Sequence, residues 1–133
     1  MIRYVGRDEL LDVHLLAVER WGGRLGIRSQ DHLVSILHAP QQTMFGVELY
    51  PSLADKAAVL GFQLLKHRPF YGGNEATALL ATLRMLSIND VPVDTTTVAA
   101  LTTALRHVLD SKMSRDELAR WVQDRCTAGW GRH

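Results

Sequence analysis

The stretch that organises this chain is KHRPFYGGNEATALL, residues 66–80, in which a Gly-Gly-Asn turn opens an apolar helix. Free backbone N–H groups at a helix N-terminus attract anions, so a turn of this kind is typical of a phosphate-binding loop. The side chains around it belong to Arg68, Gly72, Glu75 and Ala76, which include no obvious base, metal ligand or cationic clamp. The stretch predicts a loop between two helices. Whether that loop is an active site is not decided by these residues alone.

Helical periodicity continues on both sides of this loop. Apolar residues recur at intervals of three and four positions, which places them on one face of a helix. In the first such segment Leu10, Val13, Leu16 and Ala17 share that face, and all four are expected in the core. The predicted helices are about 8–21, 52–67 and 74–88, with three more that follow the capping residues Ser29, Asp94 or Thr95, and Ser114.

Residues 41–50 do not follow the helical pattern. β-branched and aromatic residues surround Gly46 there, a composition that favours an extended loop or a small hairpin. With this exception the sequence predicts an all-α fold, a compact bundle of about six helices. A chain of 133 residues suits one domain with one core, which we expect over residues 1–126, followed by a C-terminal tail at 127–133.

Composition narrows the functional classes. With 47% hydrophobic and 22% charged residues, the chain resembles an ordinary globular protein, and its net charge of +1 is too small to attract nucleic acid or acidic lipid. Scattered Lys and Arg residues also argue against a nucleic-acid partner. A single cysteine, Cys126, cannot form an internal disulfide, and no long apolar run predicts a membrane segment. We therefore expect a cytoplasmic protein.

The six histidines invite a test for a metal site. None of them forms an HxxxH or HExxH pair, and no second cysteine adds a ligand. From spacing alone we predict no metal site. The histidines are His14, His32, His38, His67, His107 and His133.

Longer stretches of the chain resemble the Doc-type branch of the Fic/Doc (fido) family. The family signature reads His-x-Phe-x-Asp/Glu-Gly-Asn-Lys/Gly-Arg, and residues 68–76 occupy its place with RPFYGGNEA. The stretches RWGGRLGIRSQDHLVSILHAPQQT and LYPSLADKAAVLGFQLLKHRPF are similar to the segments that precede the signature in this family. The resemblance extends over about residues 2–125 and implies a small helical bundle with the loop between two central antiparallel helices.

The resemblance also implies an activity and partners. Fic enzymes transfer AMP to protein hydroxyls, while Doc toxins transfer the γ-phosphate of ATP to a translation factor, and both use ATP and Mg²⁺. A partly disordered antitoxin, Phd, neutralises Doc toxins. A flap beside the loop aligns the target in this family, and residues 41–50 occupy the place of the flap.

Four signature positions differ from the family pattern. Arg68 replaces the His that acts as general base, and a guanidinium stays protonated near neutral pH. Gly72 replaces the acidic ligand of Mg²⁺, while Glu75 and Ala76 replace the basic pair that clamps the nucleotide. The signature positions that remain, with the threonine that follows, are Phe70, Gly73, Asn74 and Thr77.

Three functional hypotheses follow. The first is a toxin-derived binding protein without phosphoryl or AMP transfer, with no cofactor, which binds a Phd-like antitoxin or another protein through flap 41–50 and the loop groove. The second is an enzyme with different chemistry on a small metabolite, in which Arg68 binds an anion, a buried Glu75 transfers protons, and Asn74 and Tyr71 orient the substrate. The third is an active kinase or AMP transferase that acts on a translation factor through His67.

Overall fold

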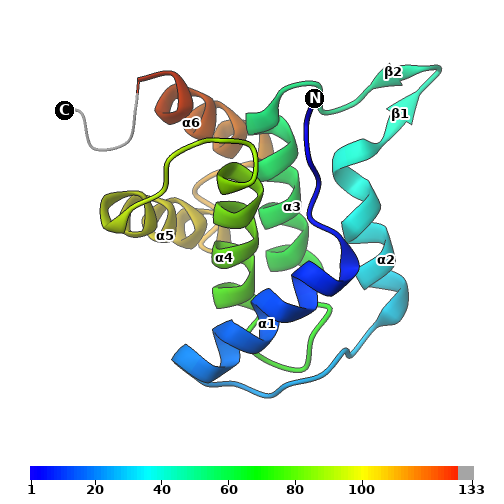
Figure 1. Cartoon of the computed structure of the whole chain (residues 1–133), viewed down its shortest axis with the longest axis vertical. Coiled ribbons are helices and arrows are strands. Elements are labelled where there is room, and N and C mark those ends of the chain that lie inside the picture. The colour runs from blue at the N-terminus through cyan, green and yellow to red at the C-terminus, as the bar shows by residue number, and fades with distance from the viewer. Residues whose placement is uncertain (129–133) are drawn as a thin grey trace.

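The computed structural model describes residues 1–128, which fold into six α-helices, one 3₁₀ turn and a two-stranded hairpin (Figure 1). The predicted all-α bundle is therefore confirmed. In chain order the elements are α1 (Arg7–Trp21), α2 (Gln30–His38), the 3₁₀ turn η1 (Ala39–Gln41), β1 (Thr43–Met44), β2 (Val47–Glu48), α3 (Leu53–His67), α4 (Asn74–Ser87), α5 (Thr95–Leu109) and α6 (Arg115–Ala128).

Side-chain caps fix where most of these helices begin. Ser29, Ser52 and Asp94 each accept a hydrogen bond from a backbone N–H three residues further on, which satisfies a donor that the helix itself leaves free. Ser114 and Glu117 form the predicted capping box, because each side chain accepts from the other residue's backbone N–H, both at 3.1 Å.

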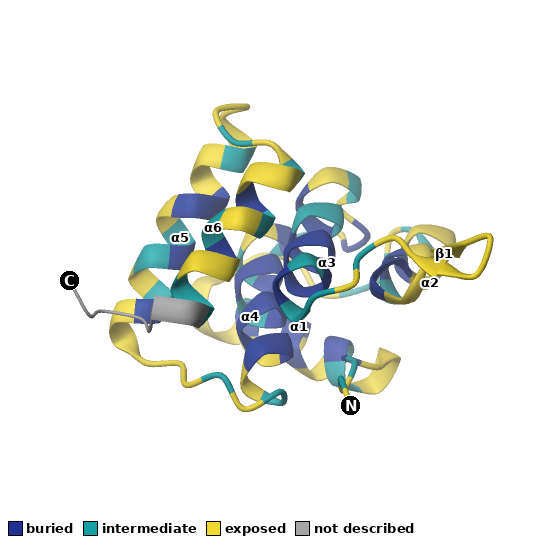
Figure 2. Cartoon of the chain, turned by 90° about the horizontal axis from the view of Figure 1, so that it is seen from above, coloured by how far each residue is buried: buried dark blue, intermediate teal, exposed yellow. Residues whose placement is uncertain are grey.

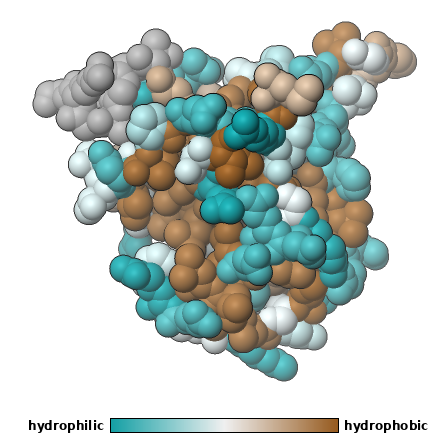
Figure 3. Space-filling model, in the orientation of Figure 1, coloured by the Kyte–Doolittle hydropathy of each residue, from teal (hydrophilic) through white to brown (hydrophobic). Residues whose placement is uncertain are grey.

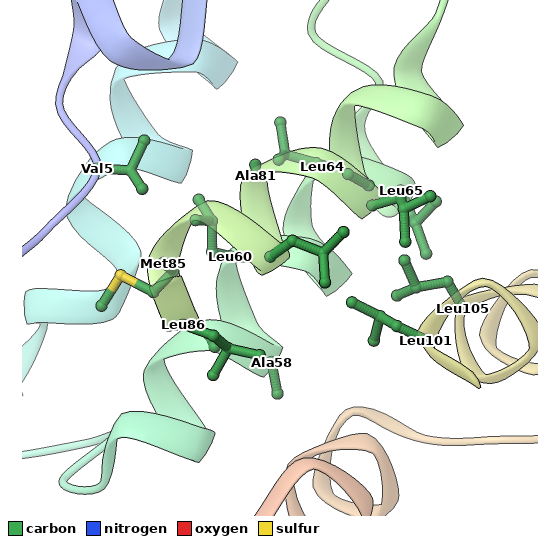
Figure 4. Packing of buried hydrophobic residues seen from close by; sticks show 14 of the residues in the cluster. Val5, Ala58, Leu60, Leu64, Leu65, Ala81, Met85, Leu86, Leu101 and Leu105 are labelled. Atoms are coloured by element: carbon green, nitrogen blue, oxygen red, sulfur yellow. The ribbon is translucent and has the colours of Figure 1, made fainter. Parts of the chain in front are cut away.

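The core lies around two central helices, α3 and α4. α3 packs most extensively against α4 and α6, and α1 lies across α4. Both central helices are buried along most of their length (Figure 2). Leucines of α3 and α4 meet leucines of α5 in this core (Figure 4). A close approach of α3 to α4 is possible because Gly61 has no side chain, and a Cβ there would collide with the hydroxyl of Thr82.

One prediction for the core of α1 is wrong. Leu16 is 51% exposed, whereas Leu10, Val13 and Ala17 are buried as expected. The fourth buried residue of this face is His14, which is 3% exposed. The buried set 10, 13, 14 and 17 fits the helical period as well as the predicted set 10, 13, 16 and 17 does. In both sets, residues three and four apart share a face of the helix. We did not expect His14 in the core because histidine is polar.

Residues 43–48 form a small hairpin, which is one of the two alternatives predicted for residues 41–50. β1 pairs with β2 in antiparallel register, Thr43 with Glu48 and Met44 with Val47. Its turn has positive φ at both central residues, 51° at Phe45 and 79° at Gly46, which matches the twist of a two-residue hairpin. A bulky residue at positive φ is strained, so Phe45 costs stability at this position.

A buried lysine holds the base of this hairpin. The Lys56 side chain comes from α3 and is 1% exposed, and its ammonium donates to the carbonyl oxygens of Pro40 at 3.1 Å and Tyr50 at 2.6 Å. Its third hydrogen bond is an ion pair with Glu48 Oε1 at 3.0 Å. All three ammonium protons can therefore be satisfied, which offsets the cost of burying the charge.

The predicted tail at 127–133 begins inside the last helix. α6 continues to Ala128, so the first two residues of the predicted tail are helical. The rest of that tail, residues 129–133, lies outside the described residues. None of the helices in residues 1–128 combines the length and apolar character that crossing a membrane requires.

Candidate functional site

The loop between α3 and α4 closes on itself through one buried side chain. Asn74, the first residue of α4, accepts from the backbone N–H of Phe70 at 3.0 Å and donates to the Phe70 carbonyl at 2.9 Å. Phe70 is 1% exposed and anchors the loop in the core. At the other end, Arg68 ends α3 with φ 45° and ψ 65°, in the left-handed region that non-glycine residues seldom adopt. The loop is therefore fixed at both ends.

The segment after α1 supports the loop along its length. The backbone N–H groups of Arg28 and Ser29 both donate to the Pro69 carbonyl, at 2.7 and 3.1 Å, and the N–H of Tyr71 donates to the Gly26 carbonyl at 3.0 Å. The Arg28 guanidinium also donates to two carbonyls at the end of α3, those of residues 67 and 68. The loop thus lies beside a second, extended piece of backbone.

Two glycines allow the two backbones to touch. A Cβ at Gly72 would lie 2.5 Å from the backbone nitrogen of Arg24, and a Cβ at Gly23 would lie 2.9 Å from the nitrogen of Gly73. Contacts this short are not tolerated, so any side chain at Gly72 requires the 22–26 segment to move. Gly73 has φ 66° and precedes α4 as its N-cap, a conformation that favours glycine.

A histidine that the sequence reasoning did not assign lies directly beneath the loop. The His14 ring stacks on Phe70, with centroids 3.8 Å apart and planes 9° apart. Its Nδ1 lies 3.1 Å from Thr77 Oγ1, and the Thr77 hydroxyl donates to the Gly73 carbonyl at 2.6 Å. Because that hydroxyl proton is used, His14 Nδ1 is the donor, and Nε2 is left as an unprotonated acceptor.

His14 is held in the neutral form. Within residues 1–128 its Nε2 has no hydrogen-bond partner, and burial lowers the pKa of the imidazole because the charged form is poorly solvated. The helical stripe of α1 was the signal that could have found this residue, since His14 lies four positions after Leu10 on the buried face. His14 therefore supports the loop from below, because it stacks on Phe70 and contacts Thr77, whose hydroxyl donates to the Gly73 carbonyl.

The polar side chains at the mouth of the loop face solvent. Arg68 and Glu75 approach to 3.8 Å, but their side chains are 50% and 61% exposed. An ion pair in this environment contributes only about 0–1 kcal/mol. The prediction that Glu75 is buried beside Arg68 is therefore wrong. Tyr71 is 50% exposed and carries the Arg24 guanidinium 4.4 Å from its ring centroid.

His67 points to a different neighbour. Its ring centroid lies 4.9 Å from that of His32 in α2, and its carbonyl accepts from Arg28. Of the predicted site residues, the structure gathers the loop positions 68–77 around the start of α4.

A cavity of about 760 Å³ opens beside the loop, between α4 and α5. Glu75 and Ala76 form part of its wall, with Leu79 from α4 and Leu105 from α5, and Trp21 at the end of α1 also contributes. Apolar surface is visible on this side of the molecule (Figure 3). Concave, largely apolar sites of this size suit ligands or apolar side chains of a partner. Among residues 1–128, no group of three or more His, Cys, Asp or Glu side chains could hold a metal ion.

Comparison with known proteins agrees with this architecture. Residues 4–86, which include the loop, α3 and nearly all of α4, match the model of the Fic/DOC family, and the chain therefore belongs to the Fic/Doc family. A curated relative is the Toxin Doc of Mycolicibacterium smegmatis (strain ATCC 700084 / mc(2)155), which is 36% identical over 91 residues. The aligned region covers 68% of this chain and 68% of that toxin, which places the chain with the Doc-type branch.

Proposed function

We propose that this chain is a Doc-derived binding protein that has lost ATP-dependent phosphoryl and AMP transfer. The observation that carries the proposal is the contact between Gly72 and the backbone of Arg24. In the family pattern this position holds the carboxylate that binds Mg²⁺, whereas here even a Cβ would lie 2.5 Å from the Arg24 nitrogen. The residues present do not fit Mg²⁺ and a triphosphate, and we derive no reaction step through them.

The electrostatics of the loop support the same conclusion. The Glu75 carboxylate lies in the first turn of α4, where it complements the positive end of the helix dipole and repels an anion that approaches the same turn. Arg68 cannot accept a proton, and Ala76 is too short to contact a phosphate. Loss of a general base alone lowers a rate by about 10²–10⁴.

Neither nearby histidine offers a replacement base. His14 is 3% exposed and lies under Phe70, so a substrate hydroxyl cannot reach it without opening the loop. His67 lies one residue before the signature position, a step that turns a side chain by about 100° around a helix, and its ring meets His32 of α2. A general base has to come within hydrogen-bond reach of the proton that it removes.

Binding of a protein partner is supported by the exposed apolar hairpin. Phe45 is 99% exposed, and Met44 and Val47 are 57% and 67% exposed, so the hairpin presents an apolar tip to solvent (Figure 3). Strain at an exposed aromatic turn residue favours a functional reason for keeping it. The partner that we propose is a Phd-like antitoxin, because the curated relative is a toxin of the Doc type. The hairpin and the cavity beside Glu75 are the surfaces offered to it.

Two measurements test the proposal. Isothermal titration of the chain with ATP and Mg²⁺ should give no binding tighter than about 1 mM, with the M. smegmatis Toxin Doc titrated in parallel as the positive control. Nucleotide binding in the micromolar range by this chain would refute the loss of transfer chemistry.

Partner binding is tested separately, by co-purification with the product of any antitoxin-like reading frame next to the gene. Phe45→Ser should weaken that complex, while Thr103→Ser, on the exposed surface of α5, should leave it unchanged. A complex with equal affinity in the wild type and the Phe45→Ser variant would exclude the hairpin as the docking surface.

A further inference from the structure

Two histidines that are far apart in the sequence meet beside the loop. His32 lies in the first turn of α2 and His67 is the last residue of α3. Their ring centroids are 4.9 Å apart, with 40° between the ring planes. No spacing rule could have paired them, because the two helices come together only in the tertiary structure, where α2 packs against α3.

The distance between the rings fits joint coordination of one metal ion. A Zn–N bond of about 2.0–2.1 Å, added to about 1.2 Å from a ring nitrogen to its centroid, puts each centroid about 3.2 Å from the ion. Two imidazoles that subtend an angle of about 90–109° at the ion are then separated by about 4.5–5.2 Å. The observed 4.9 Å lies within this range.

The backbone that carries the two rings is already fixed. Pro69 accepts from the N–H groups of both Arg28 and Ser29, and the Arg28 guanidinium donates to the His67 carbonyl at 3.1 Å. The N–H of His32 donates to Ser29 Oγ at 3.2 Å. Both ring positions are therefore tied to the same short segment, so an ion would not have to order the helices that present its ligands.

Both imidazoles are available as ligands. In the described part of the chain, neither the His32 ring nor the His67 ring forms a hydrogen bond or an ion pair, and His32 is exposed. We propose that His32 and His67 form a surface site for a first-row divalent transition metal ion, with water in the remaining positions. Imidazole nitrogens suit Cu²⁺, Ni²⁺ and Zn²⁺, whereas Mg²⁺ and Ca²⁺ require oxygen ligands.

The neighbouring charges set the strength of this site. The Arg28 guanidinium lies against the end of α3, and its positive charge repels a metal ion at this site. The last carbonyl groups of α3 carry partial negative charge and attract the ion. With only two protein ligands, the site is open and exchanges its ion readily. A metal ion bound there would cross-link α2 to the start of the loop. It would raise the unfolding temperature because it binds only the folded state.

The test is isothermal titration of the full chain with CuCl₂ and, separately, ZnCl₂ at pH 7.5. We expect binding of one ion, with copper bound more tightly than zinc. Loss of an outer partner of a metal ligand already lowers affinity about 10–100-fold, so His32→Gln and His67→Gln should each weaken binding by at least about tenfold. His107→Gln, an exposed histidine of α5, is the matched control and should leave that affinity unchanged.

A second measurement keeps the inference falsifiable if a variant loses stability. The electron paramagnetic resonance spectrum of Cu²⁺ bound to the wild type should show coupling to two imidazole nitrogens, and MgCl₂ should neither compete nor raise the unfolding temperature. Equal copper affinity in the wild type and either single variant would overturn the inference. So would a spectrum without nitrogen coupling, or loss of binding only in His107→Gln.

Discussion

The buried His14 should make the stability of the fold sensitive to mild acid. In the folded protein the pKa of this imidazole is lowered by burial, whereas in the unfolded chain it returns to about 6.5. The unfolded state therefore binds more protons as the pH falls below 6.5, and unfolding is favoured. The stability is fully present above the unfolded pKa and is lost progressively as the pH falls towards the lower pKa of the folded state.

The size of the effect follows from linkage. A single group of this kind changes the free energy of unfolding by at most about 1.4 kcal/mol per pH unit, and by about 1.3 kcal/mol between pH 7 and pH 5.5 if it stays neutral when folded. Asp94, whose pKa is lowered by hydrogen bonds from Thr97, acts below about pH 4 and does not enter this window.

Urea unfolding of the wild type and of His14→Gln, measured at intervals from pH 5 to pH 7.5, provides the assay. The wild type should lose stability towards pH 5.5 by up to the amount given above, and the variant should show a flatter profile. His107→Gln removes an exposed histidine and should keep the profile of the wild type. Parallel profiles for the wild type and His14→Gln would refute the assignment of His14 as a neutral, buried group.

Other changes probe the packing that shapes the site. Gly72→Asp restores the family's metal-ligand residue, and it should lower the free energy of unfolding by about 1–3 kcal/mol without restoring nucleotide binding. Thermal unfolding and titration with ATP and Mg²⁺ measure these two effects. A gain of binding without loss of stability would contradict the packing argument. Gly61→Ala should lower the free energy of unfolding by about 1–3 kcal/mol, and adding Thr82→Ala should recover part of that loss. Losses that simply add in the double variant would show that the two positions are not in contact. Lys56→Met should lower the free energy of unfolding in urea by about 1–3 kcal/mol, because two carbonyl oxygens at the base of the hairpin lose their donor. Backbone amides at 43–49 should exchange hydrogen faster, and unchanged exchange would argue against Lys56 as the anchor of the hairpin.

The helices were predictable because their signals are local. Apolar periodicity within each segment, and capping residues such as Ser29 and Ser114, act over three or four positions, so the sequence itself carries them. The sequence also predicted an extended loop or a small hairpin at 41–50, and it indicated the Fic/Doc family through the stretches that flank the loop. The identities of Arg68, Gly72 and Glu75 could be compared with the family signature directly, and their effect on the chemistry stays a prediction.

Tertiary structure alone decided how the loop is supported and what surrounds it. His14 reaches Thr77 across α1 and α4, Gly72 meets the backbone of Arg24, and His67 meets His32, all between segments that are distant in the sequence. Periodicity gives the face of a helix but not the neighbour that covers it, which depends on how the helices pack. Solvent exposure of Glu75 and the burial of His14 in place of Leu16 were misjudged for that physical reason.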